Sequence, residues 1–307
     1  MRNSPGIMTA NLACFLAMFM WAFAFPASEV LLQTWGVVAL LLTRTLLAVG
    51  ALTIIWLWID GFENIKSAPC FHGLKIGGIG FGVGAILLLV GQKMSDPVTP
   101  AIAAAMMPIA GAAVEVVLEK RVLKLHLIIA IILAFIGGIL AGGINFSNAT
   151  FGVGALFCLI AIVLFAWVTH ATTSDLKSLS PIGQTTITLI GSLIVVTAAY
   201  VACLAVGING THFGLTGSTD LTLLIIMAVG SIALAQLLWI WGAGGLRILF
   251  APLYKNIAPF CVMAIVVVFM GGQWNWSQAF GATLVGTAVL IAQSRQCAEF
   301  SNATNKI

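Results

Sequence analysis

Apolar residues run along almost the whole chain, and short polar stretches divide them into segments of membrane-spanning length. About 20 residues of helix cross the hydrocarbon core of a bilayer, so such runs indicate transmembrane helices. A transmembrane barrel would instead show short segments of alternating polarity. The pattern predicts an all-α integral membrane protein with ten transmembrane helices, at residues 10–25, 37–59, 76–91, 101–118, 125–144, 151–169, 182–206, 221–241, 249–271 and 276–293.

The composition agrees with a chain that folds in lipid. Of its 307 residues, 61% are hydrophobic and only 7% are charged, whereas about 25% are charged in an ordinary soluble domain. The mean hydropathy is +1.13. The connections are short, so any functional site must lie among the helices. The six cysteines are scattered and form no CxxC pair or Cys/His cluster, which favours a role as small packing residues.

The basic residues indicate how the chain is oriented. If the N-terminus is cytoplasmic, most of the 13 basic residues fall in cytoplasmic connections or tails. Only Lys93 falls outside, while Arg44 and Lys255 lie within spans. Positive charge collects on the cytoplasmic side of membrane proteins, so both termini are predicted to be cytoplasmic. The first apolar run resembles a signal peptide in composition, but the repeat described next requires it as a helix.

Two prolines divide the chain into similar halves. Pro108 lies in the fourth span and Pro259 in the ninth, about half the chain apart, and each is followed by a last span with close-set glycines. We predict two five-helix repeats, residues 1–146 and 147–307. Because five is odd, the second repeat is inverted, as in secondary transporters. A proline inside a helix costs about 3 kcal/mol, so the pair is expected to bend helices around a cavity. Lone prolines, however, are common in membrane helices.

Several motifs in this order resemble a known family. They are "MWAFAF" with Trp21, "LLTRTLLA" with Arg44, the Pro108 helix running into Glu119-Lys120-Arg121, and the second copy beginning "NIAPFCVMAIVVVF". The chain resembles the drug/metabolite transporter (DMT) superfamily, specifically its ten-helix EamA-type members, and within it the YddG-type exporters of aromatic and neutral amino acids. The resemblance implies a carrier in the bacterial inner (plasma) membrane that moves small metabolites by alternating access without ATP hydrolysis.

Lys255 is the most informative candidate for a binding residue. A lysine deep in a span costs roughly 2.5–3.5 kcal/mol unless it reaches water or a partner. We place it about two turns into the ninth helix, facing a wet cavity, where Tyr254 and Asn256 would help it to bind a carboxylate or phosphate. The alternative is that its long side chain extends to the cytoplasmic boundary.

Arg44 lies near the middle of the second span, with no acidic residue one helical turn away. It must therefore pair with another helix or reach an aqueous pocket. Glu29, near the outer end of the first helix, is the partner that we expect. A gate or an interhelical tie would account for Arg44 as well as a substrate contact would.

Aromatic and amphipathic side chains supply the remaining candidates. Trp21 and Trp167 occupy comparable places in the two halves, and His170 is a titratable group near the expected cavity. These tryptophans could form a cavity wall or simply pack between helices, and the sequence leaves both interpretations open. The full set of expected substrate-binding residues is Trp21, Phe25, Met106, Pro108, Trp167, His170, Gln236, Trp239, Tyr254, Lys255, Asn256 and Pro259. By position, the predicted interfacial tryptophans are Trp35, Trp56, Trp58, Trp274 and Trp276.

The glycines Gly78, Gly80, Gly82 and Gly84 leave the third span without side chains at alternate positions. Small residues in membrane helices usually allow close packing. A smooth wall beside a substrate is the other interpretation.

The chain contains no phosphate-binding loop, zinc-binding HExxH pair or GxSxG nucleophile motif. We therefore expect neither an enzyme nor a bound cofactor or metal, and a scaffold is disfavoured by the paired prolines and buried cations. The expected partners are a small-molecule substrate and the lipid bilayer, with no nucleic acid, and a monomer is plausible. A cargo with a carboxylate and an apolar part, such as Phe, Met or Thr, fits Lys255 and the aromatic residues. The alternative is an organic-anion carrier for phosphorylated or nucleotide sugars, which would need more than one cavity cation.

Overall fold

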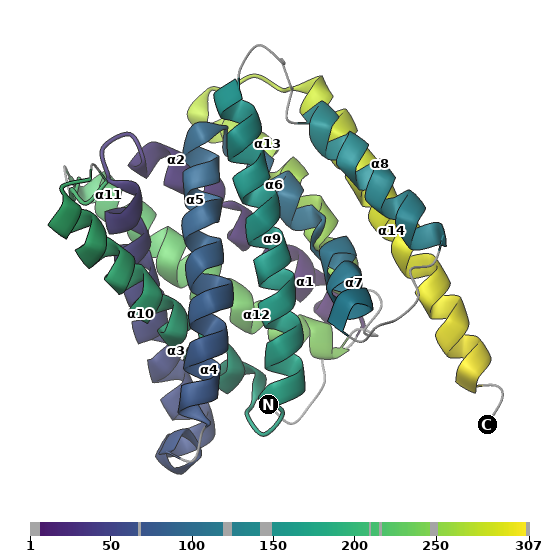
Figure 1. Ribbon diagram of the computed structural model, residues 1–307, viewed down its shortest axis with the longest axis horizontal. Helices are drawn as coiled ribbons and strands as arrows, with labels where there is room; N and C mark the ends of the chain where they lie inside the picture. The colour runs from purple at the N-terminus through teal and green to yellow at the C-terminus, as the bar shows by residue number, and fades with distance from the viewer. Residues whose placement is uncertain are drawn as a thin grey trace.

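The described part of the chain consists of helices, turns and short connections. The computed structural model describes residues 7–66, 69–118, 125–141, 149–208, 210–214, 217–245 and 251–304. Within these residues there is no strand (Figure 1). The predicted all-α class is confirmed.

Helical elements occupy each of the ten predicted spans, and several spans contain two or three consecutive elements. In the first half these are α1 (Ile7–Ala22), α2 (Ala24–Leu31), α3 (Val37–Lys66), α4 (Cys70–Gly77), η1 (Gly78–Val83), α5 (Gly84–Met94), α6 (Val98–Ala105), α7 (Met107–Leu118) and α8 (Leu125–Ala141). In the second half they are α9 (Ala149–Asp175), α10 (Pro181–Val206), α11 (Ser218–Ile225), η2 (Ile226–Leu234), α12 (Ala235–Gly245), η3 (Ala251–Ile257), α13 (Ala258–Met270) and α14 (Trp276–Thr304).

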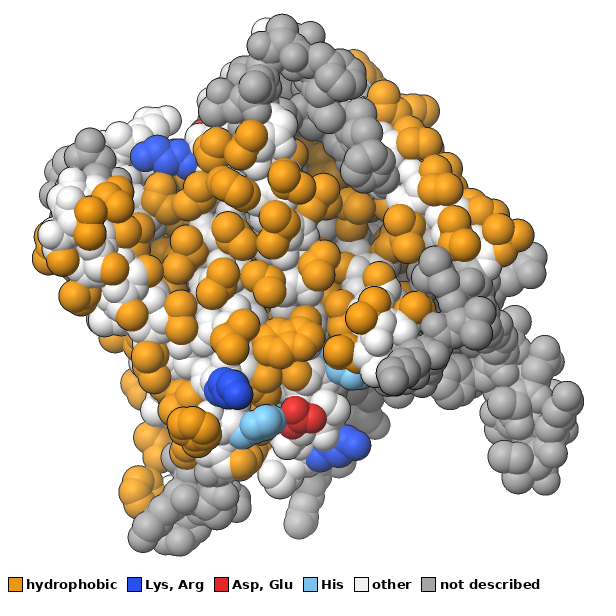
Figure 2. All heavy atoms as spheres, in the orientation of Figure 1, with side chains coloured by type: hydrophobic (Ala, Val, Ile, Leu, Met, Phe, Trp, Pro, Cys, Tyr) orange, Lys and Arg blue, Asp and Glu red, His pale blue; other side chains and the backbone are white. Residues whose placement is uncertain are grey.

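The length and apolar character of these helices make the chain a multi-pass membrane protein. In the described part, six stretches are long and apolar enough to cross a bilayer, and the pair α6–α7 makes a seventh with a bend of 49°. The stretches Tyr254–Met270 and Trp276–Ile291 are shorter apolar helices. One face of the molecule is covered by hydrophobic side chains, and its charged side chains lie toward the two ends (Figure 2). Such a surface is suited to contact with lipid tails.

Local signals fix the ends of α10. Ser180 precedes the helix and its Oγ accepts a hydrogen bond from the Gly183 N–H at 3.1 Å, while Pro181 occupies the first turn. Both are preferred at a helix start. At the other end, Gly207 has φ 71° and its N–H bonds back into the last turn, a conformation that glycine adopts without a steric penalty.

The two paired prolines lie at helix starts, which corrects the predicted kinks within continuous helices. Pro108 is the second residue of α7, after a break at Met106. Pro259 is the second residue of α13, after the 3₁₀ segment η3. A proline in the first turn removes an N–H that has no partner within the helix anyway. The free-energy cost of a proline inside a helix is therefore avoided, and the break in each span comes before its proline.

The glycines of the third span allow close helix packing, as predicted. A Cβ on Gly78 or Gly82 would lie 2.9 or 2.8 Å from Val195 of α10, and a Cβ on Gly80 would lie 2.3 Å from Val168 of α9. The π-helical segment η1 thus presents alternate glycines to two neighbouring helices. Both neighbours belong to the second half of the chain.

The predicted interfacial tryptophans divide into two groups. Trp58, Trp274 and Trp276 are exposed, in agreement with the prediction. Trp35 and Trp56 are only 1% and 3% exposed, which corrects it for these two. The Trp35 ring packs edge-on against Phe213 at 5.7 Å. Trp56 donates a hydrogen bond to Asp60 Oδ2 at 3.0 Å, so its N–H is satisfied inside the protein rather than at the membrane surface.

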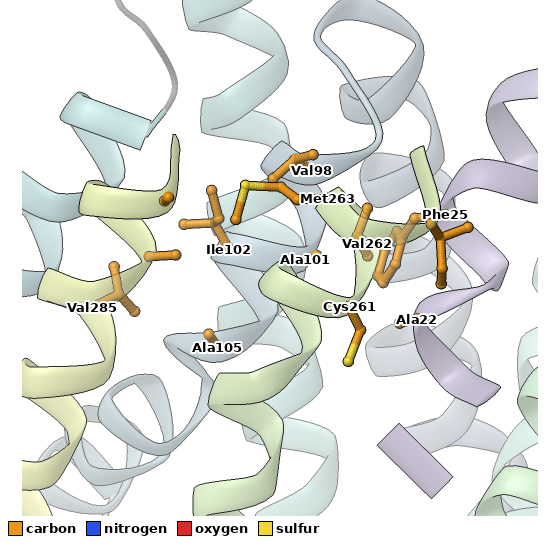
Figure 3. Close-up of a cluster of buried hydrophobic side chains, with 13 residues drawn as sticks. Ala22, Phe25, Val98, Ala101, Ile102, Ala105, Cys261, Val262, Met263 and Val285 are labelled. Atoms are coloured by element: carbon orange, nitrogen blue, oxygen red, sulfur yellow. The ribbon is translucent and has the colours of Figure 1, made fainter. Parts of the chain in front are cut away.

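The two broken spans meet in the largest cluster of buried apolar side chains (Figure 3). Ile102 of α6 and Val262 of α13 are 3% and 0% exposed. Phe25 of α2 packs against them from one side and Val285 of α14 from the other. The cluster therefore joins the fourth and ninth spans and lies beside the connection from α1 to α2. It also sits next to the cavity described below.

Candidate functional site

A cavity of about 360 Å³ lies among the helices. Its lining comes from α1, α2, α3, η1, α5, α6 and α7 of the first half and from α9, α10, η2, α12 and η3 of the second. Ligand pockets in proteins occupy roughly 300–1,000 Å³ and combine apolar walls with a few polar groups. This cavity has that character and lies between the two halves of the chain.

Six of the residues singled out from the sequence line the cavity. They come from five separate elements and include both half-buried cations: Trp21, Phe25, Arg44, Gln236, Trp239 and Lys255. The Trp21 and Phe25 rings meet edge-to-face with centroids 5.0 Å apart, an arrangement that favours a fixed wall.

The remaining predicted residues are placed elsewhere. Met106 packs into two buried apolar clusters, and its neighbour Met107 lines the cavity instead. Trp167 packs beside the cluster around Val168 and Leu176. The likeness in position between Trp21 and Trp167 therefore does not extend to the cavity.

Three predicted residues near the ninth span are also outside the lining. Tyr254 donates a hydrogen bond from its hydroxyl to Asn11 Oδ1 at 2.6 Å. Asn256 has a buried Oδ1 with no partner among the described residues. Pro259 is buried at the start of α13. Of the three consecutive residues Tyr254, Lys255 and Asn256, only Lys255 reaches the cavity.

His170 and Pro108 complete the set. His170 is half-buried on α9 and does not line the cavity. The side chain of Pro108 lies outside the described residues.

In the described part of the chain, no three His, Cys, Asp or Glu side chains come together in a way that could hold a metal ion.

Arg44 lies about two turns into α3 and lines the cavity. Its Nε is buried and has no hydrogen-bond partner among the described residues. The expected partner, Glu29, instead lies beside Gln92, whose Nε2 approaches Glu29 Oε2 at 3.4 Å. Within the described residues no ion pair joins Arg44 and Glu29, so the predicted tie between these two side chains is wrong.

Lys255 lies in η3, one turn before α13, rather than two turns inside a helix. The shift follows from the break before Pro259. The Lys255 Nζ donates to Met107 Sδ at 3.3 Å and lies 5.5 Å from the centroid of the Trp239 ring. A cation over an indole face is stabilised by about 0.5–2 kcal/mol. These contacts hold the ammonium group at the cavity wall, so the alternative in which it extends to the membrane boundary is not the one observed.

Hydrogen bonds connect neighbouring helices at the Phe25 end of the cavity. Gln92 of α5 is buried and donates from Nε2 to the Phe25 carbonyl oxygen of α2 at 2.7 Å. In the connection that follows α5, the Asp96 carboxylate accepts hydrogen bonds from the N–H groups of Val98 and Thr99 at 2.7 Å and from Gln278 Nε2 at 2.9 Å. Asp96 thus caps α6 and also connects it to α14.

Sequence reasoning missed several lining residues. Phe81 and Phe165 face each other with centroids 5.6 Å apart, and Gln92, Thr45 and Ser192 add polar groups. A glutamine near the end of an apolar run was a usable signal for Gln92. The phenylalanines gave none, because their helices are apolar on all sides.

The comparisons with known proteins agree with this architecture. Residues 8–143 match the EamA-like transporter family. The match confirms the resemblance to EamA-type transporters drawn from the sequence, but not the narrower resemblance to YddG-type exporters, and the family is one of transporters.

The likeness in three dimensions extends over both halves. One solved crystal structure, whose description names no function, superposes with a TM-score of 0.63 and 16% sequence identity. The superposition covers 94% of this chain and 99% of the other chain. At this identity the likeness concerns the fold alone. A comparison with curated protein sequences finds no match.

Proposed function

We propose that this protein is a secondary transporter that exports small metabolites by alternating access around the central cavity. The observation that carries the proposal is the cavity itself, because it is lined by both halves of the chain and contains two cations. Ionisable side chains within membrane spans usually face an aqueous path or a substrate site. The cavity is enclosed by a single chain, so we propose a monomer as the transporting unit.

Residues 1–146 and 147–307 are proposed to be inverted five-helix repeats. Helix contacts support the proposal. If each span of the first repeat is equivalent to the span five places later, a contact between two spans should recur between their two equivalents. The third span packs on the sixth through α5 and α9, and the first packs on the eighth through α1 and α12. The spans that would be equivalent also pack on each other, α6 with α13 and α8 with α14 (Figure 1). Two halves related in this way could exchange conformations around the cavity.

We propose that the protein lies in the bacterial inner membrane with both termini in the cytoplasm. The support is the distribution of basic residues, which favours the cytoplasmic side. The Phe25 end of the cavity, with Gln92 and Asp96, then faces outward.

The first candidate cargo is an amino acid with an aromatic or neutral side chain. Its carboxylate would meet Lys255, and its apolar part would contact Trp21 and Phe25. The second candidate is an organic anion. One observation favours it specifically: Arg44 lines the same cavity as Lys255, which supplies the second cation that a dianion requires.

Counterflow in liposomes tests the proposal. Purified protein would be placed in vesicles preloaded with Phe, Met, Thr or glucose 6-phosphate, with and without a pH gradient. We expect saturable uptake of at least one labelled compound, without ATP and above protein-free vesicles. Lys255→Ala should lower it with little loss of folded protein, whereas Lys75→Gln, which changes an exposed residue outside the cavity, should not. Equal uptake in protein-free vesicles for every compound would refute the transport function.

A further inference from the structure

The two cations of the cavity have no counterion among the described side chains. Within the described residues Arg44 has no hydrogen-bond or ion-pair partner, and its Nε is buried. Lys255 is held by Met107 Sδ and by the face of Trp239, and neither group carries a charge. The described protein side chains therefore leave two positive charges in the cavity uncompensated.

The carboxylates with described side chains lie elsewhere, and none of them lines the cavity. Four of them have partners of their own: Glu29 with Gln92, Asp60 with Trp56 and Ser180, Asp96 with Gln278, and Asp175 with His72. The fifth, Asp220, is buried in the first turn of α11. The cavity thus contains hydrogen-bonding and aromatic groups together with cations, and no described acid.

Arg44 and Lys255 are half-buried, and a charge that is partly shielded from water is normally paired or hydrogen-bonded because leaving it uncompensated is costly. A ligand that brings one negative charge would satisfy one cation and leave the other. A zwitterionic amino acid would bring a further positive charge into the same space. Its ammonium group would find no described carboxylate, and Lys255 already lies over the Trp239 ring.

We infer that the cavity binds a small organic dianion, with one acidic group at Arg44, the other at Lys255, and an aromatic or apolar body between them. The inference rests on the proposed transport function for its physiological meaning. The planar guanidinium of Arg44 suits a bidentate carboxylate or phosphate, while the Lys255 ammonium acts as a point charge.

The walls of the cavity suit an aromatic ring. Trp21 and Phe25 form an edge-to-face pair on one side, and Phe81 and Phe165 form a second pair with centroids 5.6 Å apart. Aromatic rings favour such offset and edge-on contacts. A flat apolar body with acidic groups would therefore contact the walls and both cations at once.

Four probes with the same benzene ring and different charges test the inference. These are phthalate and phenyl phosphate, which are dianions near neutral pH, the monoanion benzoate, and zwitterionic phenylalanine. Dissociation constants would be measured by calorimetry on the purified full chain in detergent. We expect phthalate to bind at least about tenfold more tightly than benzoate and phenylalanine, the effect of one additional charged hydrogen bond. Phenyl phosphate carries both of its charges on one group, so tighter binding of phthalate would support two separate acidic groups, and the reverse order would overturn their division between Arg44 and Lys255.

Variants then assign the two charges. Arg44→Gln and Lys255→Gln should each reduce dianion binding to the level of benzoate in the native protein, while Lys75→Gln should leave all four constants unchanged. Arg44→Lys retains the charge, so it should keep the preference for dianions even if Arg44→Gln fails to fold. Equal loss of benzoate and phthalate binding in every cavity variant, or tightest binding of phenylalanine, would overturn the inference.

Transport and binding can fail separately. Tight phthalate binding without flux in liposomes would refute the carrier and leave the dianion site standing. Flux of phenylalanine with no preference for dianions in binding would refute the dianion site and leave the carrier standing.

Discussion

The contact between α4 and α10 allows a sharp prediction, because two glycines place one helix backbone against the other. A Cβ on Gly77 would lie 2.0 Å from the Thr188 carbonyl oxygen, and a Cβ on Gly191 would lie 2.2 Å from the Leu74 carbonyl oxygen. Both obstacles are backbone atoms, so no side-chain rotation relieves them. Alanine at either position must push the two helices apart.

The expected magnitude follows from two opposing effects. Overpacking costs about 1–3 kcal/mol, and backbone contact places this case at the upper end. Replacing glycine by alanine within a helix returns about 1 kcal/mol. We expect Gly77→Ala and Gly191→Ala to destabilise the protein by about 2 kcal/mol, the difference between these terms. Gly50→Ala is the matched control in α3, because a Cβ there would meet nothing within 4 Å.

Thermal melting of the detergent-solubilised protein, followed by tryptophan fluorescence and size-exclusion chromatography, measures the effect. Gly77→Ala and Gly191→Ala should melt several degrees below the wild type, and Gly50→Ala at or above it. If Gly77→Ala had the same melting temperature as Gly50→Ala, the backbones of α4 and α10 would not be in contact, and the helix packing would be wrong.

Three further predictions concern other elements. Burial raises the pKa of Asp96, although hydrogen bonds partly oppose the rise. The protonated carboxyl therefore adds to the free energy of unfolding, and this contribution should be full below the ordinary Asp pKa and be lost as pH rises through the raised pKa. Asp96→Asn keeps the cap of α6 and should flatten this pH dependence of the melting temperature; an unchanged slope would exclude Asp96 as its source. Ser180→Ala removes the cap of α10 and should lower stability by about 1 kcal/mol in chemical denaturation, so an unaltered midpoint would argue against the cap. In a Cys297→Ser background, an impermeant maleimide should label exposed Cys70 in inverted vesicles and half-buried Cys203 only in intact cells; the opposite pattern would reverse the proposed orientation.

Much of the fold could be predicted from the sequence because lipid leaves a chain few choices. Backbone polar groups in a bilayer must be satisfied within helices, so apolar runs of sufficient length located all ten helical regions. The same reasoning explains the glycines of the third span, where the need for close packing is visible in the residue type itself. Pro108 and Pro259 marked the two broken spans, although proline chemistry placed each break before the proline rather than at it.

The site was less predictable, because helices that are apolar on every side carry no signal for which face turns inward. Trp21 and Trp167 look equivalent in the sequence, yet only Trp21 lines the cavity. The charged residues gave better guidance, since a charge within a span usually faces the interior, whereas polar His170, Tyr254 and Asn256 do not line the cavity. Arg44 and Lys255 were singled out on that ground.

The sequence by itself determined that the chain is a helical membrane protein, where its helices lie, and that two cations sit within them. Only the tertiary structure decided that Arg44 and Lys255 share one cavity and that no described carboxylate accompanies them. The physical reason is that hydropathy records how each helix meets lipid, a local property of consecutive residues. The contents of a cavity depend instead on how helices distant in the sequence rotate and pack against one another.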